Sequence, residues 1–441
     1  MIHGPDSDVG DLAEKAVAFI RERLSAAPLG RSASIAEMEE GLAGAITDNG
    51  EGVDGAWRRF TEVVVPATVG LDSERFLAFV PMSPSVAAVW MDAIVSTANF
   101  SAESWLEAAG VVAAENQVLD LLRDLAGLPL GAGGCFMSGG SIGNLSALAV
   151  ARERAGGRHL VAVADTAHAS VHNSLHLLGL EWVEVPTDHE GRLTGAAAHS
   201  ALSGRTDIGI VVASGGSTNA GVVDDLAGLA DVAAELDAWF HVDAAYGGAA
   251  MLLPEKRHLF AGIERCDSFI LDPHKWLFTP GGSCALLYRH PAEAAAVHTQ
   301  RGPYIDILRG DDDPWNPADY GYHLTRRASG LPLWFALVLH GVEAHRVAVR
   351  RGVSLAERFA AAIDECPVAE MVLRPELGVV LFRRHGWDAS QWRDWAQSVL
   401  HDGIAFVAPT TWRGEAVGRL VFMHPRTPDS IVDELVTSLG S

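Results

Sequence analysis

Short apolar runs alternate with helical patterns between residues 128 and 289, and this alternation constrains the fold more than any other feature of the sequence. Strands that alternate with helices are typical of a parallel sheet with helices on both faces. We therefore predict an α/β fold with a mainly parallel central sheet. Apolar residues at helical spacing within residues 11–66 predict a separate N-terminal helical segment.

Two of the apolar runs stop abruptly on polar residues. Residues 240–242 lead into Asp243, and residues 269–271 lead into Asp272, His274 and Lys275. In open α/β sheets, ligands bind where the strands end. A lysine can form a Schiff base with an aldehyde, and a carboxylate can pair with a protonated ring nitrogen. Asp243 and Lys275 on neighbouring strand ends therefore predict a site for pyridoxal 5'-phosphate.

A glycine-rich loop at residues 131–140 precedes a predicted helix that starts near Ile142. Glycines permit close backbone approach, and a helix N-terminus favours an anion, so Gly140 and Ser141 are candidates for phosphate contact. An ordinary helix cap by Ser141 is the alternative. The same loop fits the G-x-S-x-G pattern of serine hydrolases, but a hydrolase would leave Lys275 and its setting unexplained.

These motifs, above all Pro273-His274-Lys275-Trp276, resemble the group II amino-acid decarboxylases, and among them the aromatic L-amino-acid decarboxylases. That family has fold type I, the aspartate-aminotransferase-like fold of pyridoxal-phosphate enzymes. The resemblance extends from Arg75 to the C-terminus. It implies a large cofactor domain at 71–335 with a seven-stranded-type sheet, an N-terminal helical segment at 1–70 and a small C-terminal α/β domain at 336–441.

The resemblance also implies roles for individual residues. Lys275 would hold the cofactor, Asp243 would keep its pyridine nitrogen protonated, and His168 would stack on the ring. Cofactor contacts would also come from Ala245, Gly140, Ser141, His274 and either Ser217 or Thr218, with Asn144 and Asp224 behind them. Asp272 departs from the asparagine of some members, and an acid near a phosphate is unfavourable unless it faces away.

The resemblance places the substrate side chain against Phe79, Val80, Pro81 and Trp105. Val80 stands where aromatic decarboxylases tend to have an aromatic residue, and Met82 and Gly110 are further departures. The expected reaction is decarboxylation of an aromatic or otherwise hydrophobic L-amino acid to the amine. An acidic or diamino substrate, or decarboxylation coupled to oxidative deamination to an aldehyde, are the alternatives.

Residues 302–322 form a long irregular segment of the kind that serves as an active-site lid. The resemblance assigns Tyr304 as the proton donor to the α-carbon, with Tyr320 or Tyr322 as alternatives. A phenylalanine at this place is associated with aldehyde formation, so Tyr304 favours plain decarboxylation.

The formal net charge of -23 argues against nucleic acid or an anionic membrane as a partner. No charge-free apolar run reaches the ~18 residues of a spanning helix. Four cysteines without metal or disulfide spacing fit a reducing cytoplasm. His168, His172 and His176 are four residues apart, but no carboxylate or thiolate completes a metal set, so we predict no metal. By resemblance, the N-terminal helices embrace a second copy in a homodimer with active sites at the interface.

Overall fold

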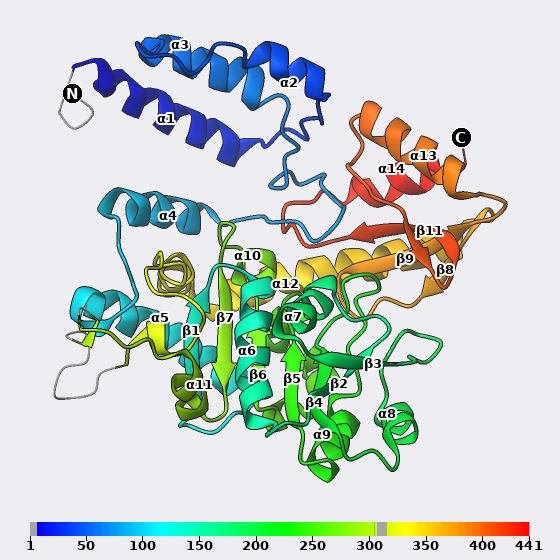
Figure 1. Cartoon of the computed structure of the whole chain (residues 1–441). Coiled ribbons are helices and arrows are strands. Elements are labelled where there is room, and N and C mark those ends of the chain that lie inside the picture. Colours follow the sequence, from blue (N-terminus) through cyan, green and yellow to red (C-terminus); the bar gives the residue numbers. More distant parts are fainter. Residues whose placement is uncertain (1–6, 304, 307–314, 441) are drawn as a thin grey trace.

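The computed structural model describes residues 7–303, 305–306 and 315–440 (Figure 1). Its centre is a seven-stranded sheet with the order β1-β7-β6-β5-β4-β2-β3. β7 runs antiparallel to both of its neighbours, and the other pairs are parallel. The predicted mainly parallel sheet is therefore confirmed. The strands are β1 (Gly133–Met137), β2 (Leu160–Ala164), β3 (Glu181–Val185), β4 (Ile208–Ser214), β5 (Trp239–Asp243), β6 (Ser268–Leu271) and β7 (Cys284–Tyr288).

Helices cover both faces of this sheet because most strands are apolar on both sides. One face packs against α6 (Gly140–Arg154), α7 (Ala169–Leu178) and α11 (Pro291–His298). The other face packs against α5 (Trp105–Ala126), α8 (Gly195–Leu202), α9 (Leu226–Glu235) and the 3-10 helices η2 (Gly247–Leu252), η3 (Pro254–Phe260) and η4 (Ile263–Arg265). The core therefore has one layer on each side of the sheet.

The C-terminal part forms a four-stranded antiparallel sheet with the order β10-β11-β9-β8. Its strands are β8 (Ala369–Leu373), β9 (Val379–Arg384), β10 (Thr410–Trp412) and β11 (Glu415–Val421). The long helix α12 (Leu331–Asp364) connects it to the large sheet, and α13 (Ala389–His401) and α14 (Ser430–Ser438) pack on it. Two further helices are short. The α-helix α10 (Pro273–Trp276) directly follows β6, and the 3-10 helix η6 (Pro317–Asp319) precedes α12.

The N-terminal helices α1 (Ser7–Ser25), α2 (Ile35–Gly41) and α3 (Gly52–Arg59) lie above α4 (Val86–Ala98), apart from the sheet (Figure 1). The π-helical turn η1 (Phe60–Val64) extends α3. Phe19, Trp57 and Phe60 pack together with ring centroids 5.4–6.1 Å apart. However, α2 and α3 contain no buried residue, so this segment buries little of its own surface.

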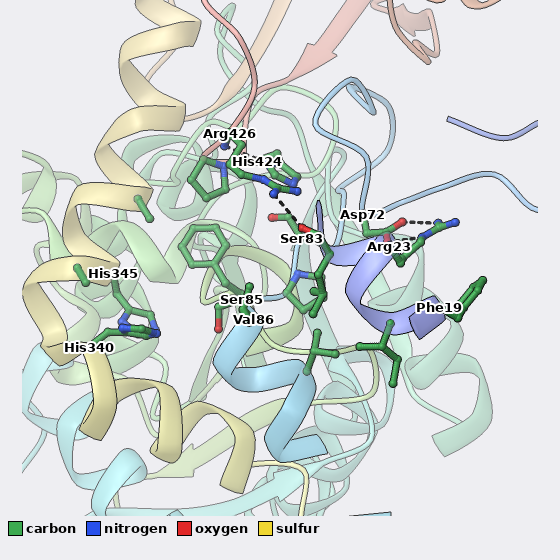
Figure 2. A pocket seen from close by; sticks show the side chains of 18 residues that line it. Phe19, Arg23, Asp72, Ser83, Ser85, Val86, His340, His345, His424 and Arg426 are labelled. Atoms are coloured by element: carbon green, nitrogen blue, oxygen red, sulfur yellow. Dashed lines mark hydrogen bonds and ion pairs between the residues drawn. The ribbon is translucent and has the colours of Figure 1, made fainter. Parts of the chain in front are cut away.

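A mostly apolar cavity of about 350 Å³ lies between α1, α4 and α12 (Figure 2). Phe19 and Arg23 stand on one side of it, and His340 and His345 of α12 stand on the other. None of the site residues predicted from the sequence lines this cavity. No helix in the described part of the chain is both long and apolar enough to cross a bilayer.

Candidate active site

Five of the residues predicted from the sequence line a second cavity, of about 490 Å³. The loops that follow β2, β4 and β6 supply His168, Thr218 and Lys275 to its wall, as expected for an α/β sheet. Phe79 and Val80 line the same cavity. The C-terminal part of the chain contributes Ala408, Pro409, Thr410 and Arg419.

Phe79 and Val80 reach the cavity because their segment pairs with the C-terminal strands. Leu77 donates its N–H to Phe406 O at 2.9 Å and accepts one from Val421 at 2.9 Å. The segment therefore behaves as a short additional strand between the two parts of the chain. Pro81, which follows, is buried and does not line the cavity.

Lys275 lies on the four-residue helix α10 directly after β6. Its Nζ is 3.0 Å from Asp272 Oδ2, and the Asp272 side chain is buried. Burial lowers the pKa of Lys275, but the carboxylates of Asp272 and Asp243 outweigh burial and leave this pKa raised. Without a ligand, Lys275 is therefore an ammonium group held at the edge of the cavity.

Asp243 ends β5 beside Ile270 of β6, so the two strand ends are neighbours. Asp243 Oδ1 accepts the N–H of Ala245 at 3.1 Å, and Oδ2 accepts Asn144 Nδ2–H at 2.9 Å. The carboxylate is 8% exposed. Two donors fix its orientation and stabilise its anionic form while leaving lone pairs for a cationic ligand group.

His168 occupies the N-cap position of α7, where its Nδ1 accepts the Ser170 N–H at 3.2 Å. The Ser170 hydroxyl lies 2.8 Å from the same nitrogen. These contacts turn the other ring nitrogen, Nε2, away from the helix. His168 therefore lines the cavity with its ring orientation fixed by the cap. His172, one turn later, instead packs edge-on against Trp182, and no group of three or more metal-binding side chains occurs in the described part of the chain.

The glycine-rich loop leads into α6, whose N-cap residue is Gly139 with φ +154° and no side-chain cap. A Cβ at Gly140 would lie 2.8 Å from Asp272 Oδ2, so only glycine fits there. Ser141 does not cap the helix, since Gly139 holds that position. Ile142 and Gly143 donate their N–H groups to Gly139 O, so the N–H groups of Gly140 and Ser141 are the ones that the first turn of α6 offers to an anion.

His274 lies beside the same loop region. Its Nδ1 contacts the backbone of Ser283, and its Nε2 is 3.7 Å from Asp272 Oδ2. Asp272 Oδ1 is buried without a hydrogen-bond partner among the described residues. Asp272 thus faces Lys275 and His274, and not solvent.

The turn after β4 separates the two hydroxyl candidates. The Ser217 hydroxyl accepts the Val222 N–H at 3.3 Å inside the turn, whereas Thr218 lines the cavity. Asp224 closes the turn by accepting the N–H groups of Ser214 at 2.7 Å and Leu193 at 2.8 Å. Burial raises the pKa of Asp224 to about 7, although these N–H groups favour the anion.

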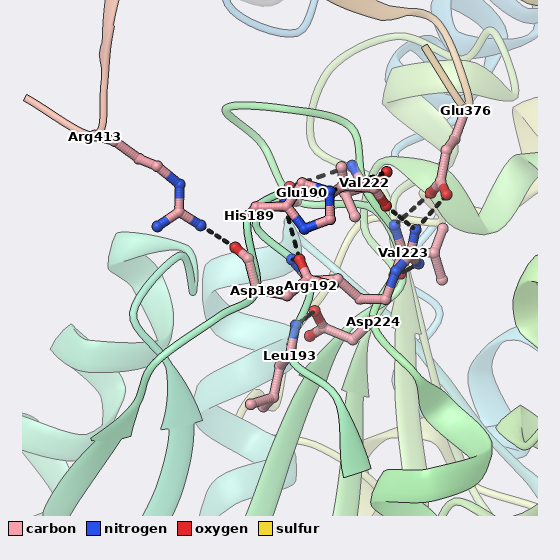
Figure 3. Close-up of polar contacts among 11 residues, drawn as sticks. Asp188, His189, Glu190, Arg192, Leu193, Val222, Val223, Asp224, Glu376 and Arg413 are labelled. Atoms are coloured by element: carbon pink, nitrogen blue, oxygen red, sulfur yellow. Dashed lines mark hydrogen bonds and ion pairs between the residues drawn. The ribbon is translucent and has the colours of Figure 1, made fainter. Parts of the chain in front are cut away.

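A charged clamp holds this turn against the C-terminal part (Figure 3). Arg192 and Glu376 form an ion pair at 2.5 Å. Glu376 also accepts the Val223 N–H at 3.1 Å, and Arg192 donates to Val223 O. Because the turn carries Thr218, the clamp fixes one wall of the cavity.

Replacing Glu376 with alanine should leave the Val223 N–H and the half-buried Arg192 unpaired. We expect the free energy of unfolding to fall by about 1–3 kcal/mol in urea denaturation. Glu190 also lies near Arg192, at 3.6 Å, but is half-exposed, so Glu190→Ala is the control and should change stability by less than ~0.5 kcal/mol. Equal effects of the two substitutions would show that the clamp does not hold the turn.

Trp105 does not line the cavity, and neither do six predicted cofactor contacts, Gly140, Ser141, Ser217, Asp243, Ala245 and His274. Trp105 begins α5, is 39% exposed, and donates its N–H to Asn316 Oδ1 at 2.9 Å. Tyr304 lies outside the described residues. Of the alternative tyrosines, Tyr320 stacks on Trp315 with centroids 4.0 Å apart, and Tyr322 is exposed; neither lines the cavity.

A model of the pyridoxal-dependent decarboxylase conserved domain matches residues 37–385. The chain belongs to this family. It is 31% identical over 376 residues to an aromatic-L-amino-acid decarboxylase of Bacillus atrophaeus, covering 81% of this chain and 78% of the relative. It is 30% identical over 377 residues to an L-2,4-diaminobutyrate decarboxylase of Rhizobium meliloti, covering 81% and 75%. The solved structure of Oryza sativa TDC with PLP and tryptamine superposes with a TM-score of 0.91 at 26% identity, over 99% of this chain and 98% of that one.

The membership confirms the resemblance, the fold type and pyridoxal phosphate as the cofactor of this decarboxylase. The residues of this chain fit the cofactor. Lys275 lines the cavity, the buried carboxylate of Asp243 ends the strand next to β6, and the N-terminus of α6, which has no side-chain cap, lies beside Asp272. The carboxylate of Asp272 near the glycine loop is balanced by Lys275 at 3.0 Å.

One residue of the decarboxylase cavity was not anticipated from the sequence. Arg419 of β11 is 5% exposed and donates to the backbone oxygens of Phe79, Thr218 and Asn219 at 2.6–3.1 Å. No carboxylate pairs with it among the described residues, and burial lowers its pKa to about 10. A lone arginine inside the apolar run 417–422 was the available signal.

Proposed function

We propose that this decarboxylase acts on an aromatic or similarly hydrophobic L-amino acid and releases the corresponding amine. The supporting observation is that Phe79, Val80 and Pro409 line the same cavity as Lys275 and offer apolar surface to a side chain. Burying a charged side chain against such a wall would be costly without a partner. The similarity to an aromatic-L-amino-acid decarboxylase points the same way.

We assign the following roles to the residues of this chain. When bound, pyridoxal phosphate supplies an electron sink for the electrons left as carbon dioxide departs. Lys275 would hold the cofactor through its aldehyde, and Asp243 would pair with its protonated ring nitrogen. His168 and Ala245 would contact the ring. The N-terminus of α6 at Gly140 and Ser141, together with His274 and Thr218, binds the phosphate.

The same residues select which bond breaks. The bond aligned with the ring π-system is weakened, so the protein must hold the substrate carboxylate perpendicular to the ring. His168 is placed to orient that carboxylate, because its ring lines the cavity and is fixed by the cap of α7. Phe79 and Val80 then fix the side chain on the other side of the α-carbon.

A panel of L-amino acids tests the substrate proposal. We expect kcat/KM for tryptophan, tyrosine or phenylalanine to exceed that for aspartate, glutamate or 2,4-diaminobutyrate by about tenfold or more. Carbon dioxide and amine should appear in equal amounts. A preference for a charged side chain would contradict the proposal.

Arg419 favours a second candidate, an amino acid with an acidic side chain. A buried cation without a carboxylate partner suits a ligand anion. If Arg419 paired strongly with the carboxylate that leaves as carbon dioxide, it would stabilise the substrate more than the transition state. A second carboxylate, on the substrate side chain, is therefore the better partner for Arg419. In the same panel, glutamate or aspartate would then be the best substrate.

We propose Tyr304 as the donor that returns a proton to the α-carbon. We expect Tyr304→Phe to lower amine output strongly and to produce aldehyde, ammonia and peroxide, since the proton is no longer supplied in time. Product analysis in the presence of oxygen measures both outcomes. Tyr322→Phe is the control, and unchanged amine output from Tyr304→Phe would remove Tyr304 from this role.

We propose a homodimer with active sites at the interface. The N-terminal helices and the neighbouring α4 and α5 expose large apolar side chains that a second copy would cover. They are Leu12, Ile35, Leu42, Phe60, Val64, Val86, Ile94, Phe100, Trp105 and Leu106. Trp105 would then line the substrate site of the partner. Sedimentation equilibrium should give twice the mass of the chain, and a monomer of full activity would contradict this arrangement.

We also propose that the protein works in the cytoplasm. All four cysteines are free thiols, and Cys135, Cys266 and Cys284 are buried. This supports a compartment in which thiols stay reduced.

A further inference from the structure

Asn144 of α6 stands at a branch point of buried hydrogen bonds. Its Nδ2 donates to Asp243 Oδ2 at 2.9 Å and to Ser170 Oγ at 3.1 Å. Its Oδ1 lies 2.9 Å from His241 Nε2. Asn144 is 1% exposed, so these bonds do not compete with solvent. One amide side chain therefore joins the carboxylate at the end of β5 to the serine beside His168.

The orientation of Asn144 is determined by its partners. The Asp243 carboxylate can only accept, so Nδ2 must face it and Oδ1 must face His241. His241 Nε2 therefore carries a proton and donates it to Oδ1. Its Nδ1 accepts the Ser268 hydroxyl at 2.8 Å, and Ser268 Oγ accepts Trp239 Nε1–H at 2.9 Å. The indole nitrogen of Trp239 can only donate, and the carboxylate of Asp243 can only accept. These two ends therefore fix the same donor-to-acceptor direction for every hydrogen bond between them.

His241 enters this network as a neutral group. It is fully buried, and burial lowers its pKa to about 4 although Asp243 opposes that shift. A neutral His241 therefore adds no second charge to the hydrogen bonds that reach Asp243 through Asn144.

The other branch of the network sets the proton position of His168. Ser170 Oγ accepts from Asn144, so its hydroxyl hydrogen is free to donate to His168 Nδ1 at 2.8 Å. The Ser170 N–H points at the same nitrogen at 3.2 Å. With Nδ1 accepting, the proton of a neutral His168 sits on Nε2, which has no hydrogen-bond partner within residues 7–303, 305–306 and 315–440.

We propose that Asn144 is a positioning residue that holds Asp243 as an oriented anion and, through Ser170, keeps the His168 proton on Nε2. The inference rests on the proposed function for its consequence: Nε2–H is then the donor offered to the substrate carboxylate, while Asp243 serves the ring nitrogen. One side chain thus prepares both groups before substrate arrives.

The chemistry of the amide makes this proposal testable by an isostere. Asn144→Asp keeps the size and the acceptor for His241 but places a second carboxylate against Asp243 and removes both donated bonds. Asn144→Ala removes the same bonds without adding charge. If Asn144 only filled space, the isosteric aspartate would be the milder change. If Asn144 acts as a donor, the aspartate must be the more harmful one.

The experiment measures the pyridoxal phosphate Kd of the full-length protein from its visible absorbance, with folding followed by circular dichroism. We expect Kd to rise about tenfold for Asn144→Ala and about 10²-fold for Asn144→Asp. Ser170→Ala breaks only the His168 branch, so Kd should stay within about twofold while kcat/KM falls about tenfold. Ser174→Ala is the matched control: its hydroxyl donates to Ser170 O at 2.7 Å on the same helix, and both quantities should stay unchanged.

Nitrogen NMR of 15N-histidine-labelled protein shows the protonation and hydrogen bonding of the two ring nitrogens of His168. The His168 signals are assigned by their absence in His168→Gln. We expect His168 to carry its proton on Nε2 in the wild type, in Ser170→Ala and in Ser174→Ala, because Ser170→Ala keeps the backbone N–H that donates to Nδ1. The His168 Nδ1 signal should move in Ser170→Ala, where the hydroxyl donor is lost, and stay in place in Ser174→Ala. A cofactor Kd for Asn144→Asp equal to or better than that for Asn144→Ala would overturn the proposal. An unchanged His168 Nδ1 signal in Ser170→Ala would overturn it as well.

These outcomes differ from a failure of the proposed function. In that case the wild type would not decarboxylate any amino acid in the panel, whereas the His168 Nδ1 signal would still respond to Ser170→Ala. The histidine measurement needs neither substrate nor turnover.

Discussion

Replacing Lys275 with alanine should abolish decarboxylation, with kcat falling by about 10⁴-fold or more. Lys275 is the only lysine that lines the cavity, so no other amine can take its place. The substitution also leaves the buried Asp272 carboxylate without its partner at 3.0 Å. We therefore expect a loss of stability of about 3–5 kcal/mol in addition to the loss of activity.

The control for this prediction is Lys256→Ala. Lys256 lies on η3, away from the cavity, and forms an ion pair with Glu357 at 3.4 Å. Its loss should leave activity and cofactor absorbance unchanged. Lys275→Arg restores a cation beside Asp272 and should recover stability but not activity. Measurable turnover by Lys275→Ala would mean that the cavity is not the active site.

Replacing Asp243 with asparagine should lower kcat by about 10²–10³-fold and weaken cofactor binding. Asparagine keeps the size of the side chain, but its single oxygen replaces two that accept from different donors, the Ala245 N–H and the Asn144 Nδ2–H, so one of these donors then faces an NH2 group. It cannot hold a proton on the ring nitrogen as an anion does, so the electron sink is lost. Asp243→Glu keeps the charge and displaces it, and should be less harmful.

The measurement is steady-state kcat together with cofactor Kd from visible absorbance. An Asp243→Asn protein with wild-type kcat would show that no cationic ring faces this carboxylate. Asp267, which accepts the Phe240 N–H at 2.7 Å at the opposite end of β5, provides the control position. Asp267→Asn should alter stability and not cofactor affinity.

The position of Asp243 and Lys275 was predictable because strand ends in α/β sheets converge. Their strands are neighbours, and both residues follow apolar runs that the sequence displays openly. The antiparallel β7 was less evident. The connection from β6 to β7, residues 272–283, contains only the four-residue α10 and no helix long enough to pack across the sheet, so the chain turns back beside β6.

The long helix after residue 330 shows where sequence patterns mislead. Residues 333–349 and 354–363 carry two separate helical patterns in the sequence. The structure instead continues through Gly352, where a Cβ would lie 2.4 Å from Phe422 O, so this glycine permits close packing. The break falls at Gly341, whose φ is +77°.

The cavity residues from the C-terminal part could not be placed from the sequence. Arg419 lies more than 140 residues after Lys275 in the chain and reaches the cavity only because residues 76–81 pair with the C-terminal strands. The choice between Ser217 and Thr218 likewise depended on which of the two hydroxyl groups forms a hydrogen bond within the turn. Long-range pairing of this kind leaves no local signal.

The most direct test of this account is covalent capture of the cofactor. The chain contains only three lysines, Lys15, Lys256 and Lys275, so a site of attachment can be assigned without ambiguity. The protein is incubated with pyridoxal phosphate, reduced with borohydride, digested and examined by mass spectrometry. We predict a stoichiometric pyridoxyl group on Lys275 and loss of the visible band. A colourless protein, or a label on Lys15 or Lys256 instead, would contradict the account.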